Sequence, residues 1–431
     1  MAEWTTEPLD QCLEALIDYR GKSPTKSPTG IPVLSAKVVK TTGLLRPIEQ
    51  TIAPDYYPQW MRRGFPRPGD VVMTTEAPMG EVIQLDDETS KFALGQRIVC
   101  LRGIPGKLDN TFLRYLLTSP FQQEILASYA TGTTVLGISQ KALRSVPISY
   151  PALDEQVAIS GLLSTLDDKI ELNRRMNETL EAQARALFRD WFVDFGPVKA
   201  KIAGDTPYLA PDLWSLFPNR LEDDGVPEGW LTYRVDEIVD HHTKSLKPMD
   251  AASEFFEHFS LPAYDGGQQP VLEAGGGIKS NKTIVPDGAI LLSKLNPEIP
   301  RVWWPQNKGA HRQIASTEFL AFTAKSGISP ALIYSLFSDQ TFRQRLEGMV
   351  TGTSKSHQRI SPPALRSLEA LVGHEKVFTV FGEITTSLMQ KVLANRAENL
   401  TLAQTRDLLL PKLMSGEIRV GDVASEELSA A

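Results

Sequence analysis

The residues of this 431-residue chain that could do chemistry gather mainly in four polar loops, at 20–26, 131–134, 277–282 and 351–359. Cations and short hydroxyl or amide side chains on turns can bond the phosphates and base edges of DNA. The alternative for any single loop is an ordinary solvated turn. The predicted DNA-contacting residues are Lys22, Ser23, Lys26, Lys37, Thr133, Thr134, Lys279, Asn281, Lys282, Ser354, Lys355, His357, Gln358 and Arg359.

Sequence motifs for catalysis and metal binding are missing. The glycines at 275–277 lack the strand–helix frame of a cofactor loop, and the Pro-Pro at 362–363 has no aromatic neighbour as in a methyltransferase. No phosphate-binding Gly-x-x-x-x-Gly-Lys run and no nuclease constellation occur. The histidines at 241–242 have no partners at metal spacing, and Cys12 and Cys100 are expected to be reduced, inert thiols. We therefore predict no catalytic residue, metal site or cofactor in this chain.

The net charge of −7 is unevenly distributed. Residues 1–150 and 230–370 each carry one excess positive charge, so the excess of acidic over basic residues lies between and after these two parts. A near-neutral domain can still gather cations on one face for phosphate contact. No apolar run has the length of a membrane helix, and the start of the chain lacks the pattern of a secretory signal. We expect a cytoplasmic protein with no membrane partner.

The chain repeats itself once, with a period of about 220 residues. Thr-Gly-Thr occurs at 131–133 and 351–353, and Leu-Arg-Ser follows each copy at 143–145 and 365–367. Near the start of each half stands a tryptophan, Trp4 or Trp230. An ordered series of such matches is unlikely to arise by chance, so we predict two similar globular parts with matched Thr-Gly-Thr loops.

A long helix is predicted after each globular part. Apolar or amide residues recur in alternating steps of three and four from Leu163 to Trp191, and the segment after Glu383 has the same register. The expected register residues are Asn173, Asn177, Asn395 and Asn399. Paired asparagines in an apolar seam select one alignment because their amides bond each other. We predict an antiparallel coiled coil with one globular part at each end, related by a pseudo-two-fold axis; the alternative is that each helix packs on its own domain.

The globular parts are predicted to be mixed α/β (α+β). Short strands are expected at 33–34, 71–73 and 98–101, and the segment at 112–127 is expected to be helical. The predicted organisation is a first globular domain at 1–150, a central helix and linker at 151–225, a second globular domain at 226–371, a C-terminal helix at 372–420 and a frayed tail at 421–431.

Taken together, these features resemble the specificity subunit of Type I restriction–modification systems over nearly the whole chain. The segment from Ala186 to Lys201 is very like that family's central conserved region. Val226-Pro227-Glu228-Gly229-Trp230 is similar to its entry to the second target recognition domain, and Leu408 to Ile418 is similar to its C-terminal conserved region. Because the recognition domains vary within this family, the resemblance identifies no base-contacting residue.

The resemblance implies a DNA-binding subunit for phage defence, in which each globular domain reads one half of a bipartite, asymmetric target. It further implies two modification subunits that carry S-adenosylmethionine and methylate adenine in double-stranded DNA, and restriction subunits that use ATP and Mg. One alternative is a stand-alone DNA-binding or decoy protein that never joins a methyltransferase. A second is an enzyme with an unrecognised site in one globular half, which the two equivalent halves without a shared catalytic cluster disfavour.

Overall fold

The computed structural model describes residues 4–19, 23–132, 135–306, 309–351 and 358–421. These residues form two compact units. Unit 1 contains residues 1–171 and 398–431, and unit 2 contains residues 172–397. Each of the two long helices contributes one part to each unit, so a helix pair can be followed within either unit by itself.

Unit 1 is built on a four-stranded antiparallel sheet in the order β2-β10-β7-β8. Its strands are β2 (Leu13–Asp18), β7 (Val71–Thr75), β8 (Met79–Gln84) and β10 (Ile98–Gly103). Every residue of the two central strands, β7 and β10, is buried. The expected strands at 71–73 and 98–101 are therefore confirmed, and their apolar runs fit strands covered on both faces.

Smaller elements surround this sheet. β1 (Thr5–Pro8) pairs with β11 (Pro147–Tyr150), and β4 (Val39–Lys40) pairs with β5 (Gly43–Leu44). β3 (Ile31–Leu34), which contains the expected strand at 33–34, lies between β6 (Thr51–Ile52) and the parallel β9 (Ala93–Leu94). The remaining short elements are η1 (Leu9–Cys12), η2 (Pro54–Tyr56), α1 (Tyr57–Trp60), η3 (Thr89–Lys91) and α4 (Gln140–Ser145).

The segment at 112–127 is helical, as predicted, and two helices occupy it. α2 (Asn110–Thr118) ends before Ser119, and α3 (Pro120–Ser128) begins at the next residue. Ser119 is the N-cap of α3, with its hydroxyl accepting from the Gln122 amide. Pro120 lacks the amide hydrogen that would continue α2, and its ring suits the first position of a new helix.

Unit 2 has the same plan. Its four-stranded sheet has the order β13-β21-β18-β19. A five-stranded sheet has the order β14-β17-β20-β15-β16, in which β15 and β20 are parallel and the other pairs antiparallel. The strands are β12 (Leu231–Arg234), β13 (Val239–His242), β14 (Ser245–Leu246), β15 (Phe255–Phe259), β16 (Val271–Ala274), β17 (Lys282–Ile284), β18 (Ile290–Ser293), β19 (Val302–Trp303), β20 (Arg312–Ala315), β21 (Phe319–Ala324), β22 (Val350–Thr351), β23 (Arg359–Ile360) and β24 (Glu369–Gly373).

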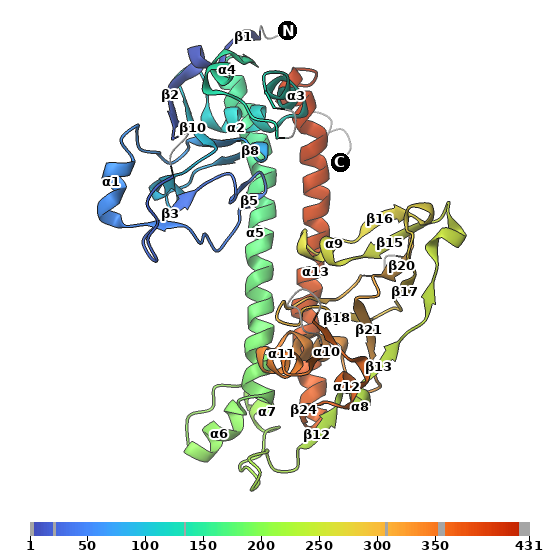
Figure 1. The fold of residues 1–431 in the computed structure, drawn as a ribbon. Coiled ribbons are helices and arrows are strands. Elements are labelled where there is room, and N and C mark those ends of the chain that lie inside the picture. Colours follow the sequence, from blue (N-terminus) through green and yellow to red (C-terminus); the bar gives the residue numbers. More distant parts are fainter. Residues whose placement is uncertain (1–3, 20–22, 133–134, 307–308, 352–357, 422–431) are drawn as a thin grey trace. The chain divides into compact units, whose positions relative to one another are not determined.

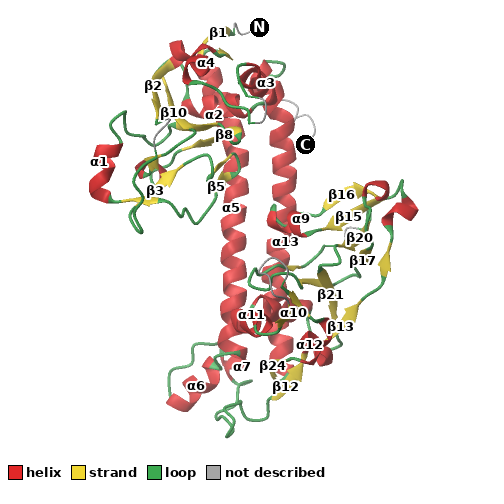
Figure 2. Ribbon diagram, in the orientation of Figure 1, coloured by secondary structure: helices red, strands yellow, loops and turns green. Residues whose placement is uncertain are grey.

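Helices complete unit 2 and the segment at 196–229, which contains two of them. They are α6 (Gly196–Ala203), α7 (Pro211–Trp214), α8 (Val235–Ile238), η4 (Pro248–Ala251), α9 (Leu261–Asp265), η5 (Gly275–Gly277), α10 (Pro330–Ser338), α11 (Gln340–Glu347) and α12 (Pro362–Ser367). α10 and α11 meet at Asp339 as α2 and α3 meet at Ser119, and Asp339 caps α11. Figure 2 displays this mixture of helices and strands in both units.

The two units share one topology, which confirms the internal repeat. The order β2-β10-β7-β8 in unit 1 matches the order β13-β21-β18-β19 in unit 2, strand for strand along the chain. The β1–β11 pair matches the β12–β24 pair, and the parallel β3–β9 pair matches β15–β20. The fold is therefore a duplicated α/β unit, as the repeated tripeptides predicted.

Two long helices, α5 (Leu153–Phe192, 40 residues) and α13 (Glu375–Ser415, 41 residues), follow the two copies of the repeat. In unit 1 the Arg406 guanidinium reaches Asp167 at 2.8 Å and the Asn399 amide reaches the Ile170 carbonyl at 3.2 Å. In unit 2 Asn177 bonds Asn395 and Phe188 packs on Phe381. Within each unit the partners move in opposite directions along the chain, so the pairing is antiparallel, as predicted (Figure 1).

The end of α5 is held in unit 2 by an aromatic cluster. Trp191 is fully buried and its ring lies 5.1 Å from that of Phe217 and 5.9 Å from that of Phe381. Phe192 packs on Phe378 and Trp230. The segment that resembles the central conserved region therefore contributes core side chains, and burial of such rings supplies a large share of a core's stability.

Asp167 joins three helices of unit 1. Its carboxylate accepts hydrogen bonds from Tyr115 on α2 at 2.6 Å and from Arg406 on α13 at 2.8 Å, and it also pairs with Arg114. Burial opposes the charge on Asp167, but the bonds from Tyr115 and Arg406 outweigh it and lower its pKa. A carboxyl group with a lowered folded-state pKa stabilises the fold above its unfolded pKa of about 3.9, and this stability is lost as the pH falls through the folded value.

We expect Asp167→Asn to lower the free energy of unfolding by about 1–3 kcal/mol at neutral pH, because two cations and a phenol lose their charged acceptor. The deficit should shrink as the pH falls below about 4 and through the lowered pKa of the folded Asp167 carboxyl, because the wild-type group then also becomes neutral. Denaturant unfolding at several pH values measures both effects. Asp168→Asn, at an exposed neighbouring position, is the matched control. A deficit of equal size at neutral and acid pH would contradict this account.

No helix among the described residues is both long enough and apolar enough to cross a membrane.

Candidate nucleic-acid interface

The basic loop of unit 1 lies on the surface beside the small β6-β3-β9 sheet. Ser23 and Lys26 are exposed, and the loop is fastened at Ser27, whose backbone pairs with Thr51 on β6. Lys37 is exposed and forms an exposed ion pair with Glu49 at 3.4 Å. Such a pair holds its members weakly, so these cations stay accessible to an anionic ligand. Lys22 lies outside the described residues.

The first Thr-Gly-Thr loop is closed at its base by backbone hydrogen bonds. The amide of Thr131 bonds the Gly137 carbonyl at 2.8 Å, and the amide of Gly137 bonds the Thr131 carbonyl at 3.0 Å. Gly132 has φ +119°, and a Cβ there would stand 2.2 Å from the Val135 carbonyl oxygen, so this position requires glycine. The predicted contact residues Thr133 and Thr134 lie outside the described residues.

The second Thr-Gly-Thr loop connects the antiparallel strands β22 and β23, in which Thr351 pairs with Arg359. The Arg359 guanidinium binds both carboxylate oxygens of Glu318, at 3.0 and 3.1 Å, and this bonding raises the pKa of Arg359. The Gln358 carbonyl accepts from the Asn296 amide at 2.9 Å. Arg359 and Gln358 thus brace the base of the hairpin. Ser354, Lys355 and His357 fall outside the part of the chain that the structure describes.

An ion pair also lies beside the first Thr-Gly-Thr loop. Here the residue before the strand is the arginine and its partner is the glutamate, the reverse of Glu318 and Arg359 beside the second loop. Arg97 directly precedes β10, just as Glu318 directly precedes β21. Arg97 lies 3.9 Å from Glu76, whose backbone bridges to Gly137 at the loop base. Neither Glu76 nor Glu318 follows from sequence reasoning, because each lies far from its loop in the chain and carries no motif.

The loop at 277–282 leads into β17 of the five-stranded sheet. Lys279 and Asn281 are exposed. Lys282 is only 7% exposed, its ammonium group donates to the Ser280 hydroxyl at 2.6 Å, and burial lowers its pKa. Lys279 and Asn281 are therefore accessible to a ligand, whereas Lys282 is bound within the protein at the start of the strand that follows them.

The four register asparagines lie where α5 and α13 pair. In unit 2 the Asn395 amide donates to the Asn177 side-chain oxygen at 2.9 Å, and both residues are buried. Asn173 is buried as well. In unit 1 the Asn399 amide donates to the backbone carbonyl of Ile170. The structure thus brings Asn177 and Asn395 together directly.

We expect Asn395→Ala to destabilise unit 2 by about 1–3 kcal/mol, because it leaves the buried Asn177 amide without its partner. Replacing both Asn177 and Asn395 by leucine should recover most of the loss, since no polar group is then stranded. A double-mutant cycle on unfolding free energies measures the coupling. Lys391→Ala, at an exposed position on α13, is the control. Additive losses in the double variant would show that the two amides do not interact.

Groups suited to catalysis do not converge in the described ranges. Within them, no set of three or more His, Cys, Asp and Glu side chains could hold a metal ion. His242 bonds Thr323 at 2.7 Å. Cys12 and Cys100 are free and buried, and burial raises the pKa of both thiols. A thiol with a raised pKa is a poor nucleophile, so both residues act as small core side chains.

Comparison with known proteins finds similarity to Type I specificity subunits over most of the chain. The family model "Type I restriction modification DNA specificity domain" matches residues 17–182. The Type I restriction enzyme MjaIX specificity subunit of Methanocaldococcus jannaschii is 25% identical over 370 residues, which cover 84% of this chain and 80% of that protein. The HindI specificity subunit of Haemophilus influenzae is 23% identical over 404 residues, covering 81% of this chain and 86% of that protein.

A solved structure is similar in fold. The S subunit of a Type I restriction–modification system from M. genitalium aligns with a TM-score of 0.54 and 17% sequence identity, covering 96% of each chain. The matched family model and the two relatives that span most of the chain agree with the observed fold. That fold consists of a duplicated α/β unit and two long helices. Residues 17–182 thus match the Type I restriction modification DNA specificity domain, and most of the chain is similar to Type I specificity subunits.

Proposed function

We propose that this chain directs a Type I restriction–modification complex to a bipartite, asymmetric DNA target for adenine methylation or restriction. The observation that carries the proposal is the duplication: two units share one strand order but present different polar side chains at their loops. Two readers with one scaffold and different surface chemistry suit a target whose two halves differ, since base edges are read by the side chains that reach them.

In this proposal residues 1–150 read one half of the target and residues 226–371 read the other. The segments 151–225 and 372–420 supply the paired helices and the linker, and residues 421–431 form a tail. The proposed contact residues of the first reader are Ser23, Lys26 and Lys37, together with Lys22, Thr133 and Thr134. Those of the second reader are Lys279, Asn281 and the loop at 354–358, whereas Arg359 and Lys282 would act by holding their loops in position.

The proposed partners are double-stranded DNA, two modification subunits and, for restriction, translocase–nuclease subunits. The modification subunits would bring S-adenosylmethionine and receive the unstacked adenine, because methyl transfer requires the base outside the helix. ATP and Mg would belong to the restriction subunits. Such partners would also supply much of the affinity for DNA. This accounts for a specificity subunit that has a net charge of −7.

Methylation by reconstituted complexes tests the proposal. The purified chain alone should neither methylate nor cut DNA, whereas the chain with the modification subunits of its own host should methylate adenine at one bipartite sequence. Methylation-aware sequencing of the DNA measures this. A chain that binds such a sequence but joins no modification subunit would instead be a stand-alone or decoy protein. Turnover of S-adenosylmethionine by the isolated chain would refute the non-catalytic role.

A further inference from the structure

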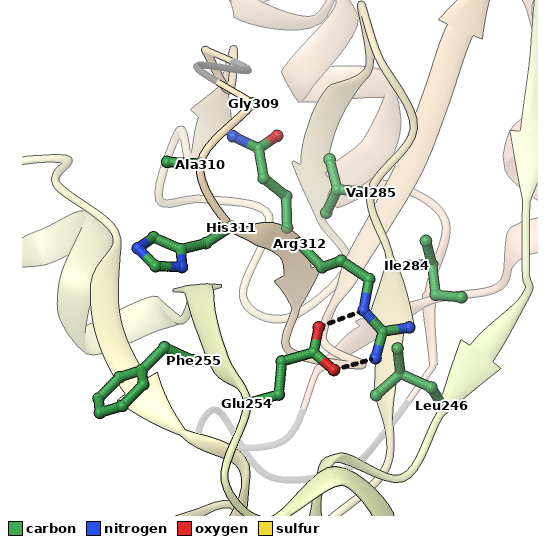
Figure 3. Close-up of a pocket in the computed structure, with 10 residues that line it drawn as sticks. Leu246, Glu254, Phe255, Ile284, Val285, Gly309, Ala310, His311 and Arg312 are labelled. Atoms are coloured by element: carbon green, nitrogen blue, oxygen red, sulfur yellow. Dashed lines mark hydrogen bonds and ion pairs between the residues drawn. The ribbon is translucent and has the colours of Figure 1, made fainter.

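A cavity of about 510 Å³ opens in unit 2 where β20 of the five-stranded sheet begins. We call it the β20 pocket and define it by Leu246, Glu254, Phe255, Ile284, His311 and Arg312, which are six of its lining residues. Figure 3 shows Arg312 and Glu254 facing each other across its floor, with Leu246 and Ile284 beside them and with His311 and Phe255 on the opposite side. None of these residues is among the DNA contacts predicted from the sequence.

The Arg312 guanidinium is held in a fixed orientation. Its Nε and Nη2 atoms donate to the two carboxylate oxygens of Glu254, at 2.5 and 2.6 Å, and it lies over the Phe256 ring with 5.1 Å between Cζ and the ring centroid. The Arg312 side chain is nevertheless 53% exposed. An arginine that is oriented in advance and still accessible loses little conformational freedom when it binds a ligand.

The N–H groups of Arg312 that do not bond Glu254 match one kind of acceptor. A guanidinium has five N–H bonds, and the carboxylate of Glu254 uses the edge formed by Nε and Nη2. The edge formed by Nη1 and Nη2 keeps two parallel N–H bonds. Two parallel donors match the O6 and N7 acceptors of guanine in the major groove, which is the commonest specific contact of arginine with DNA.

The charge of the pocket favours a base edge over a phosphate. Glu254 neutralises Arg312, so the pair attracts a phosphate anion only weakly, and its carboxylate would repel one. A base edge is uncharged and meets no such repulsion. Phe255 is 49% exposed, and with Leu246 and Ile284 it offers apolar surface that suits the face or methyl group of a neighbouring base.

From this geometry we propose that the β20 pocket reads one guanine in the half of the target assigned to residues 226–371, with Arg312 bonding the base edge and Glu254 positioning Arg312. This inference rests on the proposed function. β9 ends and β10 begins in unit 1 as β20 ends and β21 begins in unit 2, and by this alignment Arg312 corresponds to Lys91, which has no guanidinium. The guanidinium reader is therefore not repeated at that point, which suits two unlike half-sites.

Selection from a random library of DNA duplexes tests the pocket. The full chain in complex with its modification subunits is mixed with the library, and the bound sequences are read for the wild type, Arg312→Lys, Arg312→Ala and Glu254→Gln. Arg312→Lys keeps the charge but removes the two parallel donors. Glu254→Gln keeps the shape of the positioning side chain, and unlike Arg312→Ala it removes no bulk. Thermal unfolding of each variant reports whether the fold is retained.

The expected result is a change at a single position. The Arg312 variants should lose preference for guanine there by about tenfold to a hundredfold, with the other half of the target unchanged, and Glu254→Gln should lose part of that preference. The matched control is Arg301→Lys, because Arg301 makes the same two-bond contact with Asp265, at 2.8 and 2.8 Å, outside the pocket. It should keep the wild-type preference.

Three results would overturn the inference, and they separate it from the proposed function. If the wild type selects a bipartite target and the Arg312 variants select it with equal preference, only the pocket proposal fails. If the Arg312 variants bind all sequences more weakly and with a smaller salt dependence, Arg312 contacts phosphate and base reading fails. If the wild-type complex selects no bipartite sequence, the proposed function and the pocket proposal fail together.

Discussion

Exchange of residues 1–150 for the matching domain of a related specificity subunit is expected to rewrite one half of the methylated target and to leave the other half intact. The reason is that the sheet β2-β10-β7-β8 and its helices form a core within unit 1, whereas unit 2 has a complete sheet and core of its own. Methylation-aware sequencing of DNA from cells that carry the hybrid complex measures the outcome. The effect is a complete change of specificity at one half-site.

The control is a hybrid in which residues 226–371 are exchanged instead, and it should change only the other half. Unit 1 also contains the end of α13, where Leu413 and Met414 are buried in the same core as Phe112. The hybrid should therefore keep the residues of the original first domain that face α13, such as Phe112, or its stability will fall. A hybrid that is folded and active but has both half-sites rewritten would refute independent reading by the two domains.

Trp191→Ala should destabilise unit 2 by about 3–5 kcal/mol, the cost of deleting a large ring from a close-packed core. Trp191 is fully buried against Phe217 and Phe381, and it lies in the last turn of α5. A loss of this size is a large fraction of the total stability of a domain. Denaturant unfolding and limited proteolysis should both report it, together with the loss of recognition of the second half-site.

A conservative change at the same position separates packing from chemistry. The Trp191 indole N–H is buried without an acceptor among the described residues. Trp191→Phe keeps an aromatic ring and removes that unsatisfied donor, so it should cost less than half as much as alanine. If alanine and phenylalanine destabilise equally, or if alanine costs less than about 1 kcal/mol, the cluster does not hold the end of α5 as described.

The repeat and the helices were predictable because their signals are local or periodic. Thr-Gly-Thr and Leu-Arg-Ser recur about 220 residues apart, and the structure has the same strand order after the same interval. The alternating steps of three and four in each helix describe one buried stripe, and such a stripe requires a partner of equal length. The four register asparagines were predicted to lie in the seam between the helices, and in the structure the amides of Asn177 and Asn395 bond each other.

A periodic pattern does not report local structure that a single residue decides. The apolar spacing across 112–127 is continuous, but Pro120 stops α2 and starts α3 after Ser119. Lys282 looked like a surface cation in a polar loop, yet it begins a strand, and its ammonium group bonds Ser280. Backbone hydrogen bonding decides the first case and burial in a sheet decides the second, and periodicity reports neither.

The sequence by itself determined the class of this protein, because a repeat, a heptad seam and family motifs are properties of the order of residues along the chain. Only the tertiary structure decided which polar groups are committed to one another. Arg359 is bound to Glu318 and Arg312 to Glu254, over 41 and 58 positions of chain. An ion pair leaves no mark on the spacing of its partners, since it depends on where folding brings two side chains. For that reason the loops were predictable as places for contact, whereas the base-reading pocket became visible only in the folded chain.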